Sequence, residues 1–442
     1  MTTRLIPALL AAAALVAAPA ASQLLSGGLG GAVGGLGRSA GDLARPLLGQ
    51  GEQAGRQRSI VDSGVDRLSN VVSSIADAPL VLLDRRAIRL SSLIKQNRVE
   101  LDRDGAGNPV RRDRLMALNP DAAGLAAAAR AGFRVIATER DSGLGLRLVT
   151  LAVPARINPR QAIDTLRRAA PRLDLDYDHI YEPAGGALAP TTAALAISVA
   201  GFSTPGARIA MIDGGVASHP AMARASIEQK GFAGPAAATG HGTAVASLLV
   251  GDQGAFRGAA RGASLFVGDI YGGNPAAGSA STIVRALGWA AAKRPSIITI
   301  SLVGPANRAI ERTVSILRSR GILIVAAVGN DGPAAPPQYP ASYDGVVAVT
   351  GVDAKGRALI EAGRARHLDF AAPGAELAAA LPGKGYAIVR GTSFAAPLAA
   401  ARLAATGSLA ALAAEARPGK GKVGRGIVCS LCRVEPRSVG AR

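Results

Sequence analysis

From Arg208 onward, short apolar runs alternate with longer stretches in which apolar residues recur every three or four positions. The short runs are typical of buried strands, and the longer stretches are typical of helices packed on a sheet. Strands that alternate with helices predict a parallel, doubly wound α/β sheet, whose site lies at the carboxyl ends of the strands. The predicted elements are Ile209–Ile212, His241–Val250, Ser264–Ile270, Thr282–Ala292, Ile297–Leu302, Ala309–Arg320, Ile322–Val328, Val346–Val349 and Thr392–Ala405.

A second, smaller pattern occupies residues 120–184. Helices are predicted at Pro120–Gly132 and at Asn158–Ala170, where Asn158 is a cap and Pro159 stands in the first turn. Strands are predicted at Phe133–Glu139, Leu146–Val153 and Leu173–Tyr181, the first two joined by a turn at Asp141–Gly143. With one more strand near Leu115–Leu118, this order predicts a small α+β domain of the split β-α-β type.

The first residues indicate a compartment. Arg4 precedes the apolar run Leu5–Ala18, and Ala18-Pro19-Ala20 fits a cleavage pattern of small residues. A membrane-spanning helix needs about 20 apolar residues, so the run is too short to span. The order of charge, apolar core and small residues favours a removed signal peptide over a buried helix or a membrane anchor. The sequence therefore predicts a secreted or periplasmic protein with no integral membrane span.

Composition divides the remaining chain. Residues 23–60 are Gly-rich and 185–206 are nearly uncharged, so both are expected to be linkers. Between residues 60 and 118 only a helix near 80–97 is predicted. The expected organisation is a signal peptide (1–22), a Gly/Arg-rich variable region (23–118), a small domain (119–184), a linker (185–206), the α/β domain (207–428) and a C-terminal tail (429–442).

The chain of 442 residues carries a net charge of +19, which raises the question of nucleic-acid binding. Aromatic residues, which stack on bases, make up only 3% of the chain. Arginine supplies 43 of the 50 basic residues beside abundant Ala, Gly and Pro, as GC-rich codons would give. The charge is also spread along the chain, so no nucleic-acid partner is predicted.

Four segments of the α/β domain carry chemistry. Asp213 follows a buried strand, His241 begins a helix in Gly240–Ala246, Asn330 follows another strand, and Ser393 begins a helix in Gly391–Pro397. A serine hydroxyl becomes a good nucleophile when a base takes its proton, and His241 can be that base. Asp213 can orient and stabilise the imidazole, while the Asn330 amide and the Ser393 N–H can bind the developing oxyanion.

Each residue alone has an ordinary structural explanation. Asp213 could cap a strand end, His241 could be a packed residue, Ser393 could be a helix N-cap and Asn330 could be a turn residue. A purely structural interpretation requires all four explanations to hold together, for residues that stand in the order a nucleophilic site needs. The catalytic interpretation is therefore the stronger one.

The Asp213, His241 and Ser393 segments resemble the three motifs of the subtilisin-like serine peptidases, the S8 family, and they occur in that family's chain order. The resemblance covers about residues 205–428, where Gly421–Val428 resembles the family's closing segment. It implies a subtilisin-like fold and a serine endopeptidase, and members of the family often bind calcium. The segment 120–184 looks like the family's N-terminal pro-region, a partner bound in cis. The implied substrate-binding residues are Ser301, Leu302, Val303, Gly304, Ala327, Val328 and Gly329.

The sequence departs from the family pattern at four places. Gly214 stands where the family usually has Ser or Thr, which could loosen the hydrogen bonding of Asp213. Phe394 replaces a frequent Met, and Val303 stands where Gly is common and could narrow the S1 entrance. The loop Gly251–Gly258 holds one carboxylate, too few oxygens for calcium, so no metal is predicted there.

Cys429 and Cys432 are the only cysteines. A Cys-x-x-Cys pair outside a β-α-β context gives weak support for redox catalysis, and an exported chain favours a local disulfide.

Three functions remain open at this point. The leading hypothesis is an exported serine endopeptidase that cleaves protein or peptide substrates through an acyl-enzyme. A catalytically silent, subtilisin-like peptide-binding protein is the alternative, which Gly214 alone favours. An envelope-binding module driven by the positive charge would leave the four segments unexplained. The sequence indicates neither the P1 preference nor the oligomeric state.

Overall fold

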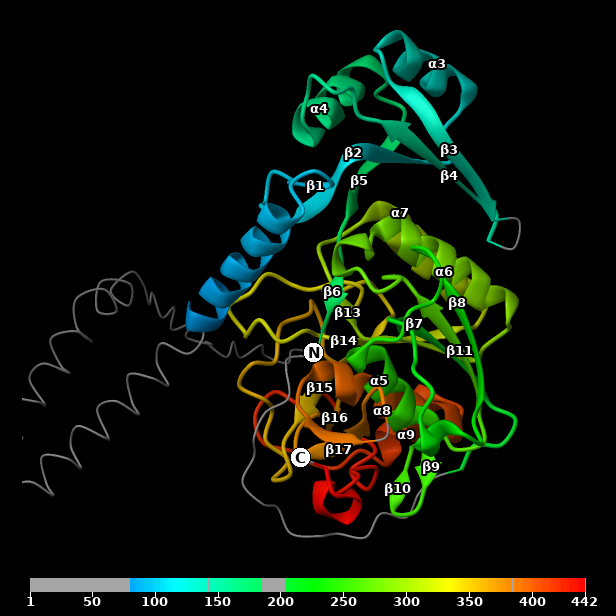
Figure 1. Ribbon diagram of the computed structural model, residues 1–442, viewed down its shortest axis with the longest axis vertical. Coiled ribbons are helices and arrows are strands. Elements are labelled where there is room, and N and C mark those ends of the chain that lie inside the picture. The colour runs from blue at the N-terminus through cyan, green and yellow to red at the C-terminus, as the bar shows by residue number, and fades with distance from the viewer. Residues whose placement is uncertain (1–79, 142–143, 185–202, 384, 442) are drawn as a thin grey trace, which may run out of the picture. The chain divides into compact units, whose positions relative to one another are not determined.

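A computed structural model describes residues 80–141, 144–184, 203–383 and 385–441 (Figure 1). Its main sheet has seven strands in the order β16-β15-β14-β12-β7-β11-β8, and every neighbouring pair is parallel. The predicted α/β fold is confirmed. The strands are β7 (Arg208–Asp213), β8 (Ser226–Gly231), β11 (Ser264–Asp269), β12 (Ile297–Ile300), β14 (Leu323–Ala327), β15 (Val347–Val352) and β16 (Phe370–Pro373).

Helices cover both faces of this sheet. Because side chains alternate along a strand, Ile209 and Met211 of β7 join the cluster with α5 (Gly240–Val250) and α8 (Thr392–Thr406). Ala210 and Ile212 join the opposite cluster with α6 (Ala280–Ala292) and α7 (Arg308–Ser319). A sheet buried on both faces requires strands that are apolar throughout, and this is the pattern that the sequence shows.

The segment before residue 185 forms a second sheet with the order β1-β2-β4-β3, in which β5 pairs with β2 and all pairs are antiparallel. Its elements are β1 (Leu101–Arg103), β2 (Pro109–Leu118), α3 (Ala122–Arg130), β3 (Arg134–Asp141), β4 (Leu146–Ala152), α4 (Pro159–Ala169) and β5 (Asp174–His179). The helices follow the prediction, and Asn158 and Gln161 form a reciprocal capping box at α4. Since β1 and β2 belong to the sheet, this N-terminal domain begins well before the predicted boundary at residue 119.

The N-terminal sheet is also buried on both faces. Leu115 and Ala117 of β2 pack with α3 and α4, whereas Met116 and Leu118 join the cluster that contains α6 and α7. The second face of this sheet is therefore covered by the α/β domain and not by helices of its own.

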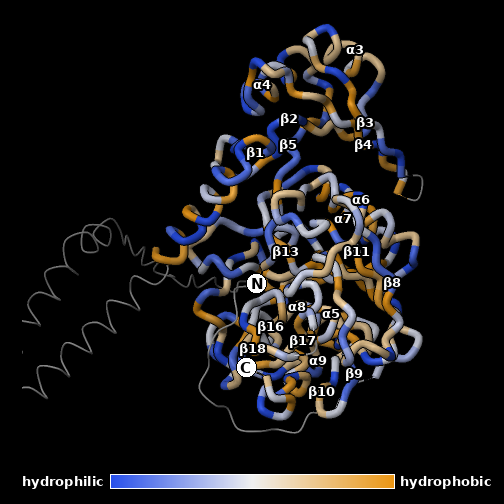
Figure 2. Tube along the Cα trace, in the orientation of Figure 1, coloured by the Kyte–Doolittle hydropathy of each residue, from blue (hydrophilic) through white to orange (hydrophobic). Residues whose placement is uncertain are grey.

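A helix covers residues 80–96 and precedes β1 (Figure 1), in agreement with the predicted helix near 80–97. Figure 2 shows that hydrophobic and hydrophilic segments alternate along this helix, as expected of a helix with one apolar face. Leu90 and Ile94 lie on its buried side.

The C-terminal residues pack on the α/β domain, whereas the sequence suggested a tail. Cys429 and Cys432 form a disulfide and lie in the cluster that contains α5 and α8. Val434 is buried, and its carbonyl accepts a hydrogen bond from the Ala378 N–H of β17 (Leu377–Ala380). Three elements without a sequence prediction complete this region: β17, its antiparallel partner β18 (Tyr386–Val389) and α9 (Leu409–Ala414). Across the described residues, no helix is long and apolar enough to cross a membrane.

Candidate active site

The carboxyl end of the main sheet holds two of the four predicted residues. Asp213 is the last residue of β7, and Asn330 follows the end of β14 by three positions. The other two lie in the first turns of helices, His241 in α5 and Ser393 in α8. Gly391, directly before α8, has a φ of 144°, which only glycine adopts readily, so the chain can turn sharply into the helix.

Asp213 and His241 form a hydrogen-bonded pair. The His241 Nδ1 lies 2.8 Å from the Asp213 Oδ1, which also accepts the Gly214 N–H at 2.7 Å. Asp213 is fully buried and can therefore hold the imidazole in one orientation. With Nδ1–H donating to the carboxylate, the other nitrogen, Nε2, is left as the proton acceptor.

Ser393 lies beside this pair. The imidazole ring of His241 is 5.4 Å from the ring of Phe394, the next residue along α8. Among the described residues, neither the Ser393 Oγ nor the His241 Nε2 has a hydrogen-bond partner, and both atoms are buried. The hydroxyl and the basic nitrogen are thus uncommitted to other groups of the fold, as a nucleophile and its base need to be.

The side chain of Asn330 has a fixed orientation. Its Oδ1 accepts the Thr392 N–H at 2.9 Å, so its Nδ2 is left to act as a donor. The same Thr392 exchanges two hydrogen bonds of 3.1 Å with the backbone of Gly329. The Asn330 Nδ2 donates to the carbonyl oxygen of Ala184. Asn330 therefore presents an amide N–H to the carbonyl of a backbone segment that lies in the site.

Residues 181–184 of the chain itself lie in the site as an extended peptide. β6 (Glu182–Pro183) pairs antiparallel with β13 (Leu302–Val303), and the Ala184 N–H donates to the Ser301 carbonyl at 2.8 Å. On the other side, the Tyr181 N–H donates to the Gly278 carbonyl at 2.7 Å. The peptide therefore adds a strand between two backbone segments, a common way to bind peptides.

Three predicted substrate-binding residues, Ser301, Leu302 and Val303, pair with this peptide through their backbone. Gly304 faces the Tyr181 ring, because a Cβ at position 304 would lie 2.6 Å from that ring. Val303 also faces Gly329, where a Cβ would lie 3.2 Å from the Val303 Cγ1. Ala327 is buried at the end of β14, and Val328, which follows it, is buried beside Gly329.

Sequence reasoning missed the groups that hold Tyr181. Its hydroxyl donates to the Pro305 carbonyl at 2.6 Å, and its own carbonyl accepts from the Tyr271 hydroxyl at 3.0 Å. Burial raises the pKa of both Tyr181 and Tyr271 well above the usual range, so both hydroxyls remain protonated donors. The sequence around these groups offers only Tyr271 before two glycines and Pro305 after Gly304. Neither pattern by itself predicts a contact with a peptide.

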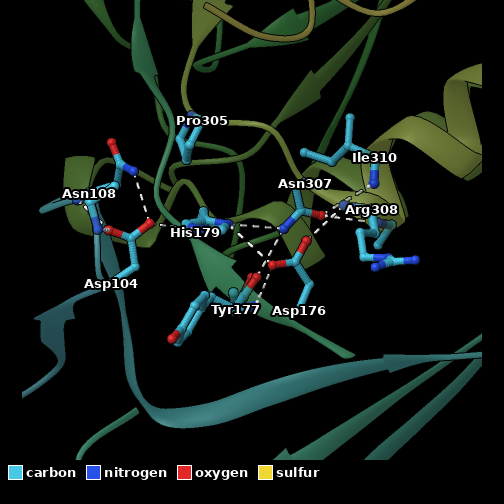
Figure 3. A network of polar contacts seen from close by, with 12 residues as sticks. Asp104, Asn108, Asp176, Tyr177, His179, Pro305, Asn307, Arg308 and Ile310 are labelled. Atoms are coloured by element: carbon cyan, nitrogen blue, oxygen red, sulfur yellow. Dashed lines mark hydrogen bonds and ion pairs between the residues drawn. The ribbon is translucent and has the colours of Figure 1, made fainter. Parts of the chain in front are cut away.

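The N-terminal domain docks through a polar network around His179 (Figure 3). Asn307 caps α7 by accepting the N–H groups of Ala309 and Ile310, so its Nδ2 donates to the His179 Nδ1 at 3.1 Å. The His179 Nε2–H then donates to Asp104 at 3.3 Å. In this arrangement Nδ1 is the acceptor and Nε2 is the donor of the His179 ring.

The short loop after α5 contains no cluster of free carboxylates. Asp252 pairs with Arg257 at 3.0 Å and with Arg261 at 3.5 Å. In the described parts of the chain, no group of three or more His, Cys, Asp or Glu side chains is placed to hold a metal ion.

A parallel α/β sheet whose strand ends carry an Asp and an Asn, with a His and a Ser in the first turns of two helices on one face, is typical of hydrolases with a serine nucleophile. Residues 204–415 match the Subtilase family, Peptidase S8. The chain is 32% identical to subtilisin Savinase of Lederbergia lenta over 203 residues, which are 45% of this chain and 74% of that protein. The chain therefore belongs to the subtilase family of subtilisin-like serine endopeptidases.

Two further relatives give the extent of the likeness. The chain is also 32% identical to the alkaline protease of Alkalihalobacillus alcalophilus, of which it spans about half, 53%. Its fold resembles fervidolysin from Fervidobacterium pennivorans, described as a keratinolytic enzyme related to subtilisin, with a TM-score of 0.63 at 18% identity. That likeness covers 77% of this chain and 62% of fervidolysin, which is more of this chain than the α/β domain alone.

Proposed function

We propose that this chain is an exported serine endopeptidase in which Asp213, His241 and Ser393 form the catalytic triad. The observation that carries the proposal is the Ala184 carbonyl, which is bound by the Asn330 amide beside the hydrogen-bonded Asp213–His241 pair. A peptide carbonyl held on an oxyanion donor is a substrate or product position, and no structural role of Asn330 requires it.

In the proposed reaction, the His241 Nε2 takes the proton of the Ser393 hydroxyl while the Oγ attacks the peptide carbonyl carbon. The carbonyl oxygen becomes an oxyanion, which the Asn330 Nδ2–H stabilises. His241 then gives its proton to the leaving amine, the C–N bond breaks, and an acyl-enzyme remains on Ser393. A water molecule, deprotonated by His241, hydrolyses this ester and returns the free serine.

The first substrate is the chain itself. Ala184 is the residue whose carbonyl meets Asn330, so the bond cut is Ala184–Gly185, directly before the region 185–206 that the sequence predicts to be a linker. The segment that ends at Ala184 then fills the site as a product and acts as a pro-region in cis. Cutting this bond produces a mature chain whose first residue is Gly185.

The contacts of residues 181–184 also support a substrate preference. A small residue precedes the cut bond, and an aromatic residue stands three positions before it, at Tyr181. The space for its ring exists because residue 304 is glycine, and its hydroxyl has an acceptor in Pro305. We expect peptides with Ala next to the cut and Tyr or Phe three positions earlier to be cut fastest.

Export is proposed on the sequence, because residues 1–22 lie outside the described residues. The disulfide between Cys429 and Cys432 supports it, since disulfides persist in oxidising compartments outside the cytoplasm.

Gly214, the feature that favoured a silent peptide-binding protein, has a steric explanation. A Cβ at position 214 would lie 2.3 Å from the Oγ1 of Thr239, the residue that caps α5. Thr239 thus fills the space that a Ser or Thr side chain at position 214 would need. This supports an active enzyme, because the glycine preserves the start of the helix that carries His241.

The test compares the wild-type chain with Ser393→Ala, both purified free of other peptidases. Wild type should react with a fluorophosphonate probe and yield a protein whose N-terminal sequence begins at Gly185. Ser393→Ala should bind no probe, stay joined at Ala184–Gly185, and lose on the order of 10⁴–10⁶ in kcat. Equal cutting of both chains would refute self-processing, and near-parental activity of Ser393→Ala would refute the assignment of the nucleophile.

A further inference from the structure

The helix over residues 80–96 contacts both the bound peptide and the wall of the active site. Its buried side places Leu90, Leu93 and Ile94 against the N-terminal domain, where Leu93 packs on a cluster of Leu101, Ile180 and Ala276. Ala276 belongs to the α/β domain. Near the other end of the helix, Leu82 lies against Gly332, where a Cβ would be 2.9 Å from the Leu82 Cδ1. The helix therefore crosses from the N-terminal domain to the edge of the active site.

Two arginines of this helix, Arg86 and Arg89, hold two carboxylates together. The Asp331 carboxylate lies 3.2 Å from the Arg86 Nε in an ion pair and accepts a hydrogen bond from the Arg89 Nη2 at 2.9 Å. The Arg89 Nε also lies 3.2 Å from both oxygens of Glu182. Arginine suits this role because its planar guanidinium can donate to two carboxylates at once.

The two carboxylates stand on opposite sides of the bond that is cut. Glu182 lies two residues before Ala184, on the segment that becomes a separate fragment. Asp331 directly follows Asn330 and stays with the enzyme. Arg89 bridges them, so cutting Ala184–Gly185 breaks no contact of this cluster.

Burial makes the cluster costly to disrupt. The side chain of Asp331 is only 7% exposed and that of Glu182 is 19% exposed. Burial raises the pKa of Glu182 even though Arg89 opposes this shift, which indicates a carboxylate that depends on its partner. Without the arginines, both carboxylates would remain buried without compensating charge, which is strongly unfavourable. Arg89 itself is 45% exposed, so salt in the solvent can weaken its pairs.

We propose that helix 80–96 is a clasp that keeps the cut pro-region bound to the enzyme. This inference rests on the proposed self-processing. The clasp separates two events: the bond is cut first, and activity appears only when the Arg86–Arg89–Asp331–Glu182 cluster opens. On the enzyme side the clasp contacts Asp331, whereas Glu182 leaves with the same fragment as the clasp.

The experiment follows cutting and activity separately in the full chain. Intact mass measures cutting, and hydrolysis of a chromogenic peptide with Tyr-Glu-Pro-Ala before the reporter measures activity. The clasp variant is Arg86→Ala with Arg89→Ala. The control is Lys95→Ala with Arg98→Ala, which also removes two positive charges from exposed positions that, within the described residues, make no ion pair.

We expect equal cutting rates in all three chains. The interval between cutting and activity should be shorter in the clasp variant by about tenfold or more, because truncating one side of a buried charge pair acts mainly on dissociation. Raising the salt from about 0.05 M to about 1 M should shorten the interval in wild type and in the control but not in the clasp variant.

Normal cutting with the same interval in all three chains would overturn the clasp alone. An interval in wild type that does not respond to salt would also overturn it, whatever the variants do. Absence of cutting in wild type would overturn the proposed function as well as this inference, so the two failures are distinguishable.

Discussion

The two sheets of this protein are buried on both faces, but different parts of the chain cover them. The main sheet has α5 and α8 on one face and α6 and α7 on the other, all from its own domain. The N-terminal sheet has α3 and α4 on one face, whereas its other face packs on α6 and α7 of the α/β domain.

This difference separates a domain that can stand alone from one that depends on its partner. The α/β domain loses contacts on the outer side of α6 and α7 if the N-terminal domain leaves, but its sheet stays covered. The N-terminal sheet would instead expose Met116, Leu118 and Leu148 to water. Changes at the edge of the main sheet should therefore alter catalysis, and changes at the docking face should alter only retention of the pro-region.

After the loss of the nucleophile itself, the largest expected effect follows from removing the oxyanion donor on the catalytic side. Asn330→Ala should lower kcat by about 10²–10³ with little change in KM, since the donor acts mainly on the transition state. Steady-state kinetics on a peptide measures both constants. Thermal melting should fall by a few degrees at most, because the Thr392 N–H loses its acceptor. A variant that loses affinity but keeps kcat would show that Asn330 binds substrate instead.

A smaller effect is expected at Gly214, also on the catalytic side. Gly214→Ala pushes a Cβ into Thr239 and so disturbs the start of α5, which carries His241. Overpacking of this kind costs about 1–3 kcal/mol, and we expect kcat/KM to fall by about tenfold or more.

Two further variants test the mechanism of this loss. Adding Thr239→Ala to Gly214→Ala removes the two atoms closest to the new Cβ and should restore part of the activity. The restoration should be incomplete, because the helix cap that Thr239 provides, about 1 kcal/mol, is lost. Gly240→Ala is the matched control, because a Cβ there meets nothing within 4 Å. An equal loss in Gly240→Ala would show that the helix start is sensitive for another reason.

The sequence was sufficient for the elements that follow one strong pattern. Five apolar strands of the main sheet and the capped helix at Asn158 are local features, and the structure has them where they were predicted, whereas the apolar strand β16 was not predicted. Several strands were not predicted, and β8 and β17 illustrate two different reasons. β8 is a largely exposed strand, Ser226–Gly231, without apolar alternation, and β17 is Leu-Ala-Ala-Ala, which has weak strand propensity.

The parts that the sequence could not provide depend on contacts between distant segments. The run Leu115–Leu118 is apolar at every position because two different domains cover its faces, and one sequence does not reveal this. Likewise, Arg86 and Arg89 are two among 43 arginines, and only the fold brings them to Asp331. The position of Ala184 on Asn330 is also a long-range contact, which is why the sequence alone does not name the bond that we propose is cut.

Among substitutions on the docking face of the N-terminal domain, we expect the larger effect from a change at Asp178. This carboxylate is fully buried and accepts the Ser281 N–H at 2.8 Å and the Ser281 hydroxyl at 2.9 Å, in the first turn of α6. A negative charge is favourable at a helix N-terminus, and hydrogen bonds to charged groups contribute about 1.5–3 kcal/mol.

Asp178→Ala should therefore weaken retention of the cut pro-region by about 10- to 100-fold. The measurement is the fraction of fragment that coelutes with the enzyme as the complex is diluted. The kcat of the released enzyme should equal that of wild type, and Asp164→Ala, an exposed carboxylate on α4, should change neither quantity. A changed kcat in Asp178→Ala would contradict the separation of the two sides.

The smallest effect is a pair of opposite pH dependences in the network of Figure 3. Burial alone would raise the pKa of Asp104, but hydrogen bonds from His179 and Asn108 outweigh it and lower the pKa below its usual value. Burial raises the pKa of Asp176, and the nearby His179 does not reverse this shift. Both carboxylates face the same imidazole, so comparing them isolates the effect of the sign of the pKa shift.

A lowered pKa means that Asp104 contributes stability above its unfolded value of 3.8 and that this contribution is lost as the pH falls through the lower folded value. The contribution of Asp176 to stability has the opposite pH dependence. It is present at low pH and is lost as the pH rises through the raised pKa of Asp176. The melting temperature of the uncut Ser393→Ala chain, measured between about pH 5 and about pH 3, reports both. Asp104→Asn should make its fall toward acid pH shallower, and Asp176→Asn should make it steeper. Equal slopes in the two variants would show that these carboxylates do not govern docking, and the stability of the N-terminal domain would then rest on its apolar face alone.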